Sequence, residues 1–359
     1  MAHVHVVILG LTRREDEPKI KRLFAYADIK GSPVESGHSK ISPYLIDATR
    51  LTDSHLVVRE ASKPINALPV LLMGTKPTEG GHLIFTEEES QKFLGIEPGA
   101  AQFLRPFTGS EELINGDMRH ILVLKDATPN QLRSLPHVLD RLERVRKMRQ
   151  ESKKPATRNL ADTPTRFECG AIPDSPYLAV PEVSSERREY VPIAYLEPPI
   201  VPSNLLRILP DVSLWLFALL TSGMHMAWLR TVGGRLESRY RYTIGMVYNT
   251  FPLPVLTDAD KASLDALAQK VLDARALFPD SSLADLYDRL TMPPALRKAH
   301  STLDTAVEKL YRPQPFADDR ERTTHLLTRY EALTAPLLAL AQQKPKRLRP
   351  PEAVTEGNL

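Results

Sequence analysis

One stretch of the sequence decides how its central region is interpreted: Gly233-Gly234-Arg235-Leu236-Glu237-Ser238-Arg239-Tyr240-Arg241-Tyr242. The two leading glycines and the aromatic residues favour an extended strand over a helix. In a strand, residues two apart share a face. One face is then charged and carries Arg235, Glu237, Arg239 and Arg241. The other face carries Leu236, Ser238, Tyr240 and Tyr242, so the sequence predicts one amphipathic strand.

A charged face of this composition suits the major groove of duplex DNA. Arginine donates two parallel hydrogen bonds to the O6/N7 edge of guanine, and a carboxylate accepts from the N4 amine of cytosine. The alternative is a solvated helix, in which Glu237 and Arg241 form an ion pair one turn apart. Rows of charge are common on protein surfaces. The residues alone therefore leave base recognition and a solvated surface both open.

The overall composition neither supports nor excludes a nucleic-acid partner. The chain has 47 Lys and Arg against 44 Asp and Glu, which gives a formal net charge of +3. Such a balance produces no strong global field, so any case for DNA binding rests on local clusters. A length of 359 residues is enough for about two or three domains with real cores.

The cysteine content and the longest apolar run exclude two other classes of protein. Cys169 stands alone, so it forms no internal disulfide and no cysteine-rich zinc module, which is compatible with a cytoplasmic location. The apolar run 212–229 is interrupted by Ser222, Gly223 and His225, and it falls short of the ~20 residues that span a bilayer. We therefore predict a buried helix there and no membrane partner.

The order of apolar patterns predicts an α+β fold with a mixed centre and a helical C-terminal part. Thr86 and Glu89 have the spacing of a capping box, which predicts a helix start. An apolar strand is expected at 2–11, and short strands are expected at 56–59, 82–85, 121–124, 177–180 and 190–193. Helices are expected at 129–154 and 214–232, and then in a bundle that begins near Asp258 or Asp260 and continues through 282–290, 293–311 and 320–340. The polar tail 344–359 is predicted to be disordered.

Two further basic clusters each admit a structural and a functional interpretation. In the segment 184–190, the candidates for phosphate contact are Ser185, Arg187 and Arg188, and the alternative is a capped turn with local ion pairs. The helix 129–154 has one apolar face, and its other faces carry Arg141, Arg144, Arg146, Lys147 and Arg149. These basic residues form either a solvated surface or a clamp on the DNA backbone.

No catalytic site is predicted in this chain. His3 and His5 share a face of the expected opening strand, but a metal site needs at least one more ligand, and none stands at a recognisable spacing. Asn249 is followed by Thr250 and not by the proline found in amino-group DNA methyltransferases, so a structural turn is expected. No glycine-rich loop follows a strand with an acidic residue downstream, and Cys169 has no activating neighbours. We assign no catalytic residue, no metal and no cofactor to the chain.

Several strings, spread in order over nearly the whole chain, together resemble one family. They are similar to the C-terminal half of MmeI-like restriction–modification proteins (type IIG/IIL), which fuse an endonuclease, an adenine-N6 DNA methyltransferase and a target-recognition domain. The strings are Ala2-His3-Val4-His5-Val6-Val7-Ile8, Ile41-Ser42-Pro43-Tyr44-Leu45, Val183-Ser184-Ser185-Glu186-Arg187-Arg188, Thr221-Ser222-Gly223-Met224-His225-Met226-Ala227-Trp228, Gly234-Arg235-Leu236-Glu237-Ser238-Arg239-Tyr240-Arg241-Tyr242, Tyr248-Asn249-Thr250-Phe251-Pro252-Leu253-Pro254 and Leu296-Arg297-Lys298-Ala299-His300.

The resemblance implies a division of the chain and a set of DNA-contacting residues. Residues 1–46 would be the end of the methyltransferase domain, including the last strand of its Rossmann-like sheet, and residues 47–255 the DNA target-recognition domain. Residues 256–343 would be the C-terminal helical domain, followed by the tail 344–359. The residues that would read bases are Glu237, Arg239 and Arg241. Those that would contact the DNA backbone or support the site are Arg235, Ser185, Arg187, Arg188, Arg230, Tyr240, Arg146 and Lys147.

The resemblance also implies which functions lie outside this chain. The family's S-adenosylmethionine motif, its adenine-pocket motif and its nuclease motif all stand upstream of the part that the strings match. We therefore expect this chain alone not to be catalytic, and S-adenosylmethionine to bind the missing N-terminal half. The expected partners are double-stranded DNA and a separate chain with the catalytic half. The alternatives are a non-catalytic interaction scaffold, a remnant of a split methyltransferase gene, and a stand-alone enzyme that uses the histidine pair.

Overall fold

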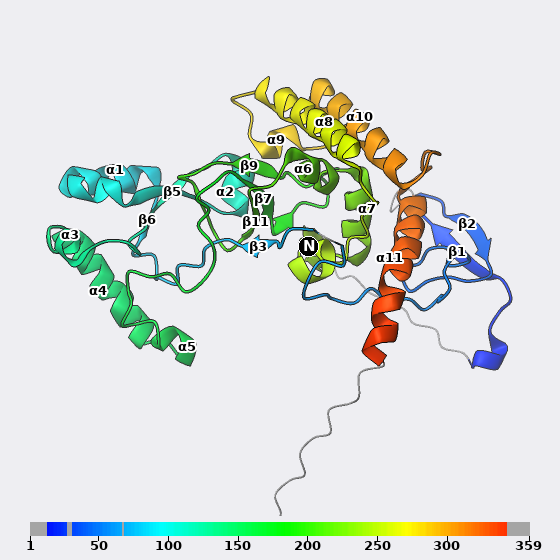
Figure 1. Cartoon of the computed structure of the whole chain (residues 1–359), viewed down its shortest axis with the longest axis horizontal. Helices are drawn as coiled ribbons and strands as arrows, with labels where there is room; N and C mark the ends of the chain where they lie inside the picture. The colour runs from blue at the N-terminus through cyan, green and yellow to red at the C-terminus, as the bar shows by residue number, and fades with distance from the viewer. Residues whose placement is uncertain (1–12, 27–30, 67, 343–359) are drawn as a thin grey trace, which may run out of the picture. The chain divides into compact units, whose positions relative to one another are not determined.

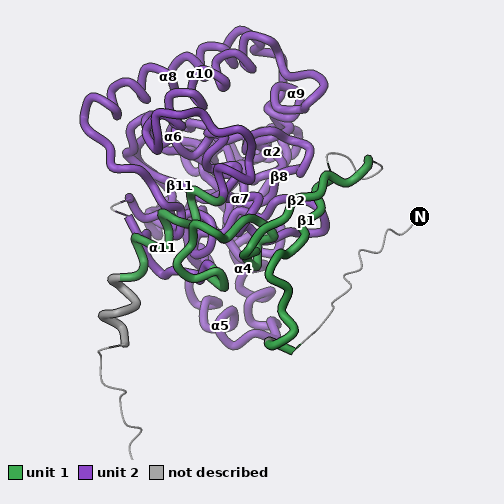
Figure 2. Tube along the Cα trace, turned by 90° about the vertical axis from the view of Figure 1, so that its right-hand side faces the viewer, with its two compact units in different colours: residues 1–57, 324–359 green, residues 58–323 purple. Residues whose placement is uncertain are grey.

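The computed structural model describes residues 13–26, 31–66 and 68–342, and the chain divides into two compact units (Figure 2). One unit comprises residues 1–57 and 324–359, and the other comprises residues 58–323. The strand expected at 2–11, with His3 and His5, and the tail 344–359 lie outside the described residues. Within the described ranges, no helix is long and apolar enough to cross a membrane.

The smaller unit combines a two-stranded sheet with most of the last helix. Its elements are η1 (Arg14–Asp16), β1 (Lys21–Ala25), β2 (Val34–His38) and the part of α11 (Asp319–Gln342) that follows Thr323. The carboxylate of Glu331 on α11 accepts the backbone N–H groups of Thr52 and Asp53 at 3.0 and 2.7 Å. This side chain therefore fixes the loop that follows the sheet.

The described part of the larger unit (58–66 and 68–323) contains three sheets. The first has the order β10 (Val201–Pro202), β5 (Leu104–Thr108), β6 (Arg119–Leu122) and β4 (Ile84–Phe85). The second has the order β3 (Leu72–Met73), β11 (Leu206–Pro210), β7 (Tyr177–Pro181) and β9 (Ala194–Leu196). The third has the order β12 (Gly234–Leu236), β13 (Arg239–Arg241) and β8 (Val183–Ser184).

The strands expected at 82–85, 121–124 and 177–180 correspond to β4, β6 and β7, but two expected strands are wrong. Residues 56–59 form no strand; Val58 is buried in a loop, and the nearby N–H of Ala61 donates to the carbonyl of Gly245 instead (3.0 Å). Residues 190–193 also form no strand, because Pro192 has no N–H and the N–H of Ile193 donates to the carbonyl of Val191 (2.8 Å) in a tight turn. The strand β9 begins directly afterwards and pairs with β7.

The segments between and after β4, β5 and β6 form helices, and the sequence predicts those that begin after Thr86 and at Pro129. The helices are α1 (Glu87–Ile96), η2 (Pro98–Gln102), α2 (Ser110–Asn115), α3 (Pro129–Arg133), α4 (Pro136–Gln150) and α5 (Pro155–Arg158). The capping box is confirmed: Thr86 Oγ1 accepts the N–H of Glu89 (3.2 Å), and the Glu89 carboxylate accepts the N–H of Thr86 (2.8 Å). The expected helix 129–154 is divided, because Pro136 starts a new helix. The apolar face of α4 enters the core of this region, as its periodicity predicts.

The apolar helix expected at 214–232 is also divided. It forms α6 (Leu214–Leu220) and α7 (Gly223–Val232), and Ser222 caps α7 by accepting the N–H of His225 at 3.3 Å. A serine and a glycine in succession favour such a break, because serine caps well and glycine weakens a helix interior. The second half, α7, leads directly into the third sheet through Gly233.

Three helices follow in this unit: α8 (Asp258–Ala276), α9 (Leu283–Leu286) and α10 (Pro294–Tyr311). The helices α8 and α10 pack on α6 and α7, side by side over α6 in Figure 1, and α9 packs on α2. Asp304 of α10 joins them to the centre: its two oxygens accept the hydroxyl of Tyr190 and the N–H of Gly223, both at 2.7 Å. Burial raises the pKa of Asp304 to about 6. The mixed α+β architecture with a helical C-terminal part is therefore the one predicted.

Candidate nucleic-acid interface

The charged stretch forms a β-hairpin and not the single strand that the alternation predicts. The strands β12 and β13 pair antiparallel, with Leu236 opposite Arg239 and Gly234 opposite Arg241. The two residues between them, Glu237 and Ser238, make the turn, and Glu237 takes a positive φ of 57°. Two-residue hairpin turns require positive φ, because only then does the turn match the twist of the strands. We call residues 234–241 the recognition hairpin.

The reversal changes which side chains share a face. Arg239 and Arg241 remain together and are exposed, and Tyr240 between them is buried at 6% exposure. Residues directly opposite in an antiparallel pair lie on the same face. Arg235 stands opposite Tyr240 and stacks on its ring, with Cζ 4.2 Å from the ring centroid. The expectation that Arg235 belongs to the same row as the other arginines is therefore wrong.

A groove of about 430 Å³ runs beside the recognition hairpin. It is lined by residues of the hairpin, of the segment around β8, of α2 and of the turn before β11: Leu236, Arg239, Glu182, Val183, Ser184, Ser185, Arg188, Ser110, Glu111, Ile114, Asn115 and Leu205. Ser184 Oγ and Arg188 Nε in its wall are buried and have no hydrogen-bond partner within the described residues. Both atoms are covered by the protein itself, and the exposed cation at the groove is Arg239.

Glu182 is the site residue that sequence reasoning missed. Its carboxylate is 13% exposed and bridges two cations, Arg207 at 2.9 Å and Arg241 at 3.3 Å. Its backbone carbonyl accepts the N–H of Tyr242 at 2.7 Å, so the same residue continues the pairing between β13 and β8. The available signal was a carboxylate directly after the apolar strand 177–181, but its partners lie far along the chain.

The segment after β8 combines its two interpretations. Ser185 Oγ accepts the N–H of Arg187 at 3.2 Å, which is the capped turn expected of a structural role. The side chain of Arg187 is nevertheless exposed, and Arg188 lines the groove. Burial lowers the pKa of Arg188, but arginine remains a cation at neutral pH. The turn therefore presents cations beside the hairpin.

Arg230 and Tyr240 lie behind the hairpin and are used by the protein itself. Arg230 donates to the hydroxyl of Tyr240 (3.3 Å), to the carbonyl of Glu189 (3.0 Å) and to the carboxylate of Asp319 (2.5 Å). Tyr240 in turn donates to the carbonyl of Glu186 at 3.3 Å. In this structure both residues support the hairpin and do not face solvent with free groups.

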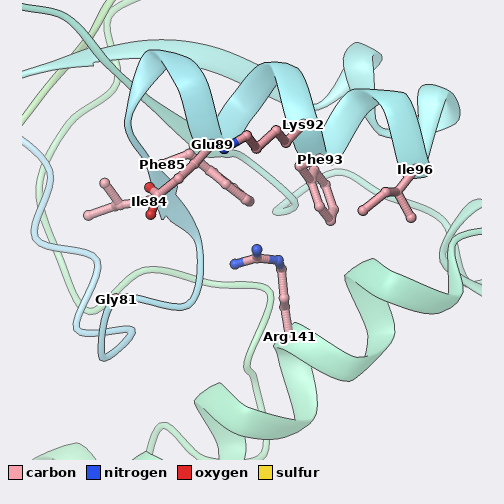
Figure 3. A pocket seen from close by; sticks show the side chains of 8 residues that line it. All are labelled: Gly81, Ile84, Phe85, Glu89, Lys92, Phe93, Ile96 and Arg141. Carbon is pink, nitrogen blue, oxygen red and sulfur yellow. The ribbon is translucent and has the colours of Figure 1, made fainter.

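The basic helix α4 packs with the first sheet, whereas the hairpin forms part of the third sheet. The cationic side chains of α4 already have partners within the protein. Arg146 pairs with Glu143 at 2.8 Å, and Lys147 lies 3.9 Å from Glu151. Arg141 points away from α4 toward α1, as Figure 3 shows, and its guanidinium carbon lies 4.2 Å from the ring centroid of Phe85.

Arg149 contradicts the expectation of a solvated or DNA-facing side chain. It has no exposed surface and donates to the carbonyls of five residues: Pro77, Thr78, Leu160, Thr163 and Arg166. All these distances lie between 2.8 and 3.1 Å. A cation that is fully satisfied by the backbone has no donor left for phosphate.

The structure also bears on the residues considered for catalysis. The Asn249 side chain donates to the carbonyl of Ala61 at 2.7 Å and is buried, which is the structural role expected of it. Cys169 is exposed. Among the described residues, no group of three or more His, Cys, Asp or Glu side chains is placed to hold a metal ion.

Comparison with known proteins gives a consistent assignment. The family model of the MmeI target recognition domain matches residues 52–255, and that of the MmeI C-terminal domain matches residues 255–338. The chain is 36% identical over 296 residues to DNA methyltransferase A of Bacillus subtilis (strain 168), covering 82% of this chain and 33% of that protein.

A solved structure is similar over most of the described fold. The Type IIL restriction-modification enzyme MmeI in complex with DNA superposes with a TM-score of 0.82 at 36% sequence identity. The match covers 89% of this chain and 42% of that chain. This chain therefore spans less than half the length of the relatives that it matches.

Proposed function

Because the chain belongs to the MmeI family, with a target recognition domain and a C-terminal domain of a DNA methyltransferase, we propose that it recognises a specific sequence in duplex DNA. The complete enzyme would methylate the N6 amine of adenine within a restriction–modification system of the type IIG/IIL kind, and the cytoplasm is then the expected compartment. The bases would be read by Glu237, Arg239 and Arg241.

The proposal includes a division of the chain. Residues 1–46 end the methyltransferase domain, 47–255 form the target-recognition domain, 256–343 form the C-terminal helical domain, and 344–359 are a tail. The ranges matched by the two family models, 52–255 and 255–338, support the boundary near residue 255. The break between the end of η3 (Ile244–Tyr248) and the capped start of α8 at Thr257 falls at the same place.

The proposal rests mainly on the pair of exposed arginines on β13, Arg239 and Arg241, beside the groove. Arg239 is 47% exposed and its partner Glu237 is 77% exposed, at 2.9 Å from each other. An exposed pair of this kind contributes about 0–1 kcal/mol. A bidentate contact between arginine and guanine discriminates by about 1–3 kcal/mol. Base contacts can therefore replace the ion pair at little cost.

The remaining cations near the hairpin would hold the DNA backbone. Arg187, Arg188 and Ser185 stand on the turn beside the groove, and Arg235 lies on the opposite face of the hairpin. Phosphate contacts fix the register of a protein on the duplex without specifying sequence. Arg146 and Lys147 of α4 would contact the backbone only by exchanging their present carboxylate partners.

Methyl transfer itself requires parts that we do not assign to the described residues. S-adenosylmethionine supplies the methyl group in this class of enzyme, and the adenine must leave the base stack to reach it. The catalytic half would be supplied by a separate chain or by a longer form of this protein. The role of the part described above is to choose where on the DNA this chemistry takes place.

The test is selection from a randomised duplex pool, together with affinity measured at several salt concentrations. Sequence-specific recognition predicts an enriched motif, and phosphate contacts predict that affinity falls linearly with salt on logarithmic axes. Absence of binding, or binding that ignores ionic strength, would favour the interaction scaffold. Binding that depends on salt but enriches no motif would show a DNA clamp without base recognition.

A further inference from the structure

We propose that Arg230 is a positioning residue that holds the recognition hairpin against the C-terminal helices through Asp319. The charge pair between these two residues would then determine how sharply the hairpin discriminates base pairs, although neither side chain touches a base. The effect on specificity rests on the proposed function. The mechanical link between Asp319 and the hairpin does not.

The first step is the place of Tyr240 in the hairpin. It stands between Arg239 and Arg241 on β13, and it is the buried residue of the three. Side chains alternate along a strand, so fixing Tyr240 also fixes the direction in which its two neighbours leave the backbone. The ring is covered by Arg235, and the hydroxyl donates to the carbonyl of Glu186. Tyr240 is therefore the point at which the hairpin is attached from behind.

Three acceptors surround the guanidinium of Arg230. Its guanidinium reaches β13 through Tyr240, the turn after β8 through Glu189, and the start of α11 through Asp319. Burial lowers the pKa of Arg230, but Asp319 and Tyr240 raise it by more, so the cation is stabilised in place. The planar fork of arginine serves several acceptors in fixed directions, and lysine does not.

The third step carries the link into the C-terminal helices. The second oxygen of Asp319 accepts from Arg322 at 2.8 Å. Arg322 also donates twice to Glu308 of α10, at 2.8 and 2.6 Å. Glu308 is 8% exposed, so this end of the chain of contacts is anchored in packed structure. A continuous series of charged hydrogen bonds therefore runs from α10 to the hairpin.

The mechanical part is tested by backbone hydrogen exchange on the full chain with Asp319→Asn. We expect exchange of the β13 amides and of the Tyr242 amide to accelerate about tenfold, because a coupled charged contact is lost. Amides of β6 in the first sheet should be unchanged. The matched control is Asp318→Asn, the same substitution one residue earlier, where the carboxylate only caps α11 by accepting the N–H of Glu321 at 2.9 Å.

Two results would overturn the mechanical part. One is unchanged exchange in the hairpin with Asp319→Asn. The other is acceleration spread equally over β6 and β13, since that describes a loss of global stability. Asp319→Glu keeps the charge and should restore slow exchange, which also protects the test against a variant that simply folds poorly.

The effect on specificity is tested with duplexes that differ at single base pairs. Asp319→Asn and Arg230→Lys should each reduce discrimination about tenfold at the base pairs read by the hairpin, with the salt dependence of binding unchanged. Asp319→Glu should retain discrimination. If amide hydrogen exchange in the hairpin becomes faster but base-pair discrimination stays unchanged, the proposed effect of the Arg230–Asp319 pair on specificity is wrong. If the wild-type chain binds no DNA, the proposed function fails, and hydrogen exchange still decides the mechanical link.

Discussion

The arginines of α4 and those of the recognition hairpin are the same kind of residue in opposite situations. Arg149 is fully buried, and its donors are taken up by five backbone carbonyls. Arg239 and Arg241 are about half exposed, and each pairs with one carboxylate among the described residues. A run of basic residues in a sequence therefore does not show which cations are available. Availability depends on how many donors the fold has already used.

The largest expected effect comes from removing the buried cation. Arg149→Met should lower the free energy of unfolding by about 3–5 kcal/mol, because buried carbonyls lose a charged donor. Urea unfolding followed by circular dichroism measures this. Arg146→Met on the exposed face of the same helix is the matched control and should change stability by less than about 0.5 kcal/mol. Equal effects of the two substitutions would show that the buried arginine contributes no more to stability than the exposed one.

The second prediction extends the comparison from cations to carboxylates. The pKa of Asp304 is raised by burial to about 6, so the folded state holds its proton more tightly than the unfolded state. Its contribution to stability is therefore complete below the unfolded pKa near 4 and is lost as the pH rises through 6. Relative to Asp304→Asn, the wild type should lose about 1 kcal/mol per pH unit between pH 4 and 6.

Denaturant unfolding of both proteins across that range measures the difference between them. A difference that stays constant with pH would show that Asp304 keeps an ordinary pKa.

The third prediction concerns the available cations. Arg239→Ala should cost about 1–3 kcal/mol at one base-pair position and relax discrimination there, with little change in folding stability. Competition among four duplexes that differ at that position measures it. Weakening by the same factor on all four would assign Arg239 to phosphate and not to a base.

The smallest expected effect separates backbone contacts near the hairpin from those on α4. Arg187→Ala should weaken binding by the same factor on all sequences and reduce the slope of log affinity against log salt by about 0.9. Lys147→Ala removes the same charge from α4 and should leave this slope unchanged. An equal change of slope for Lys147→Ala would extend the DNA interface to α4.

The sequence predicts local features of this fold well, because they depend on neighbours within a turn. The apolar period of α4, the capping box of Thr86 and Glu89, and the start of α8 near Asp258 all follow from residues three or four apart. The composite family resemblance supplies the rest of the architecture. The local signals by themselves do not predict how the helices and strands are arranged.

The site was predicted less completely, because its geometry depends on distant partners. The alternating pattern predicts one strand through Glu237, because the turn sequence Glu237-Ser238 contains no Gly or Asn, which mark most hairpin turns. The partner strand β8 lies more than 40 residues upstream, and the bridging role of Glu182 depends on Arg207 and Arg241. The sequence does not predict the burial of Arg149 for the same reason, since its carbonyl partners come from two separate loops.

The exposed–buried–exposed order along β13 has a consequence for redesign. Exchanging Arg239 or Arg241 for other polar side chains leaves the core untouched, whereas inserting one residue within β13 would turn an arginine inward and the tyrosine outward. A combinatorial library built on this segment should therefore vary side-chain identity at constant length. Insertions and deletions belong in other loops.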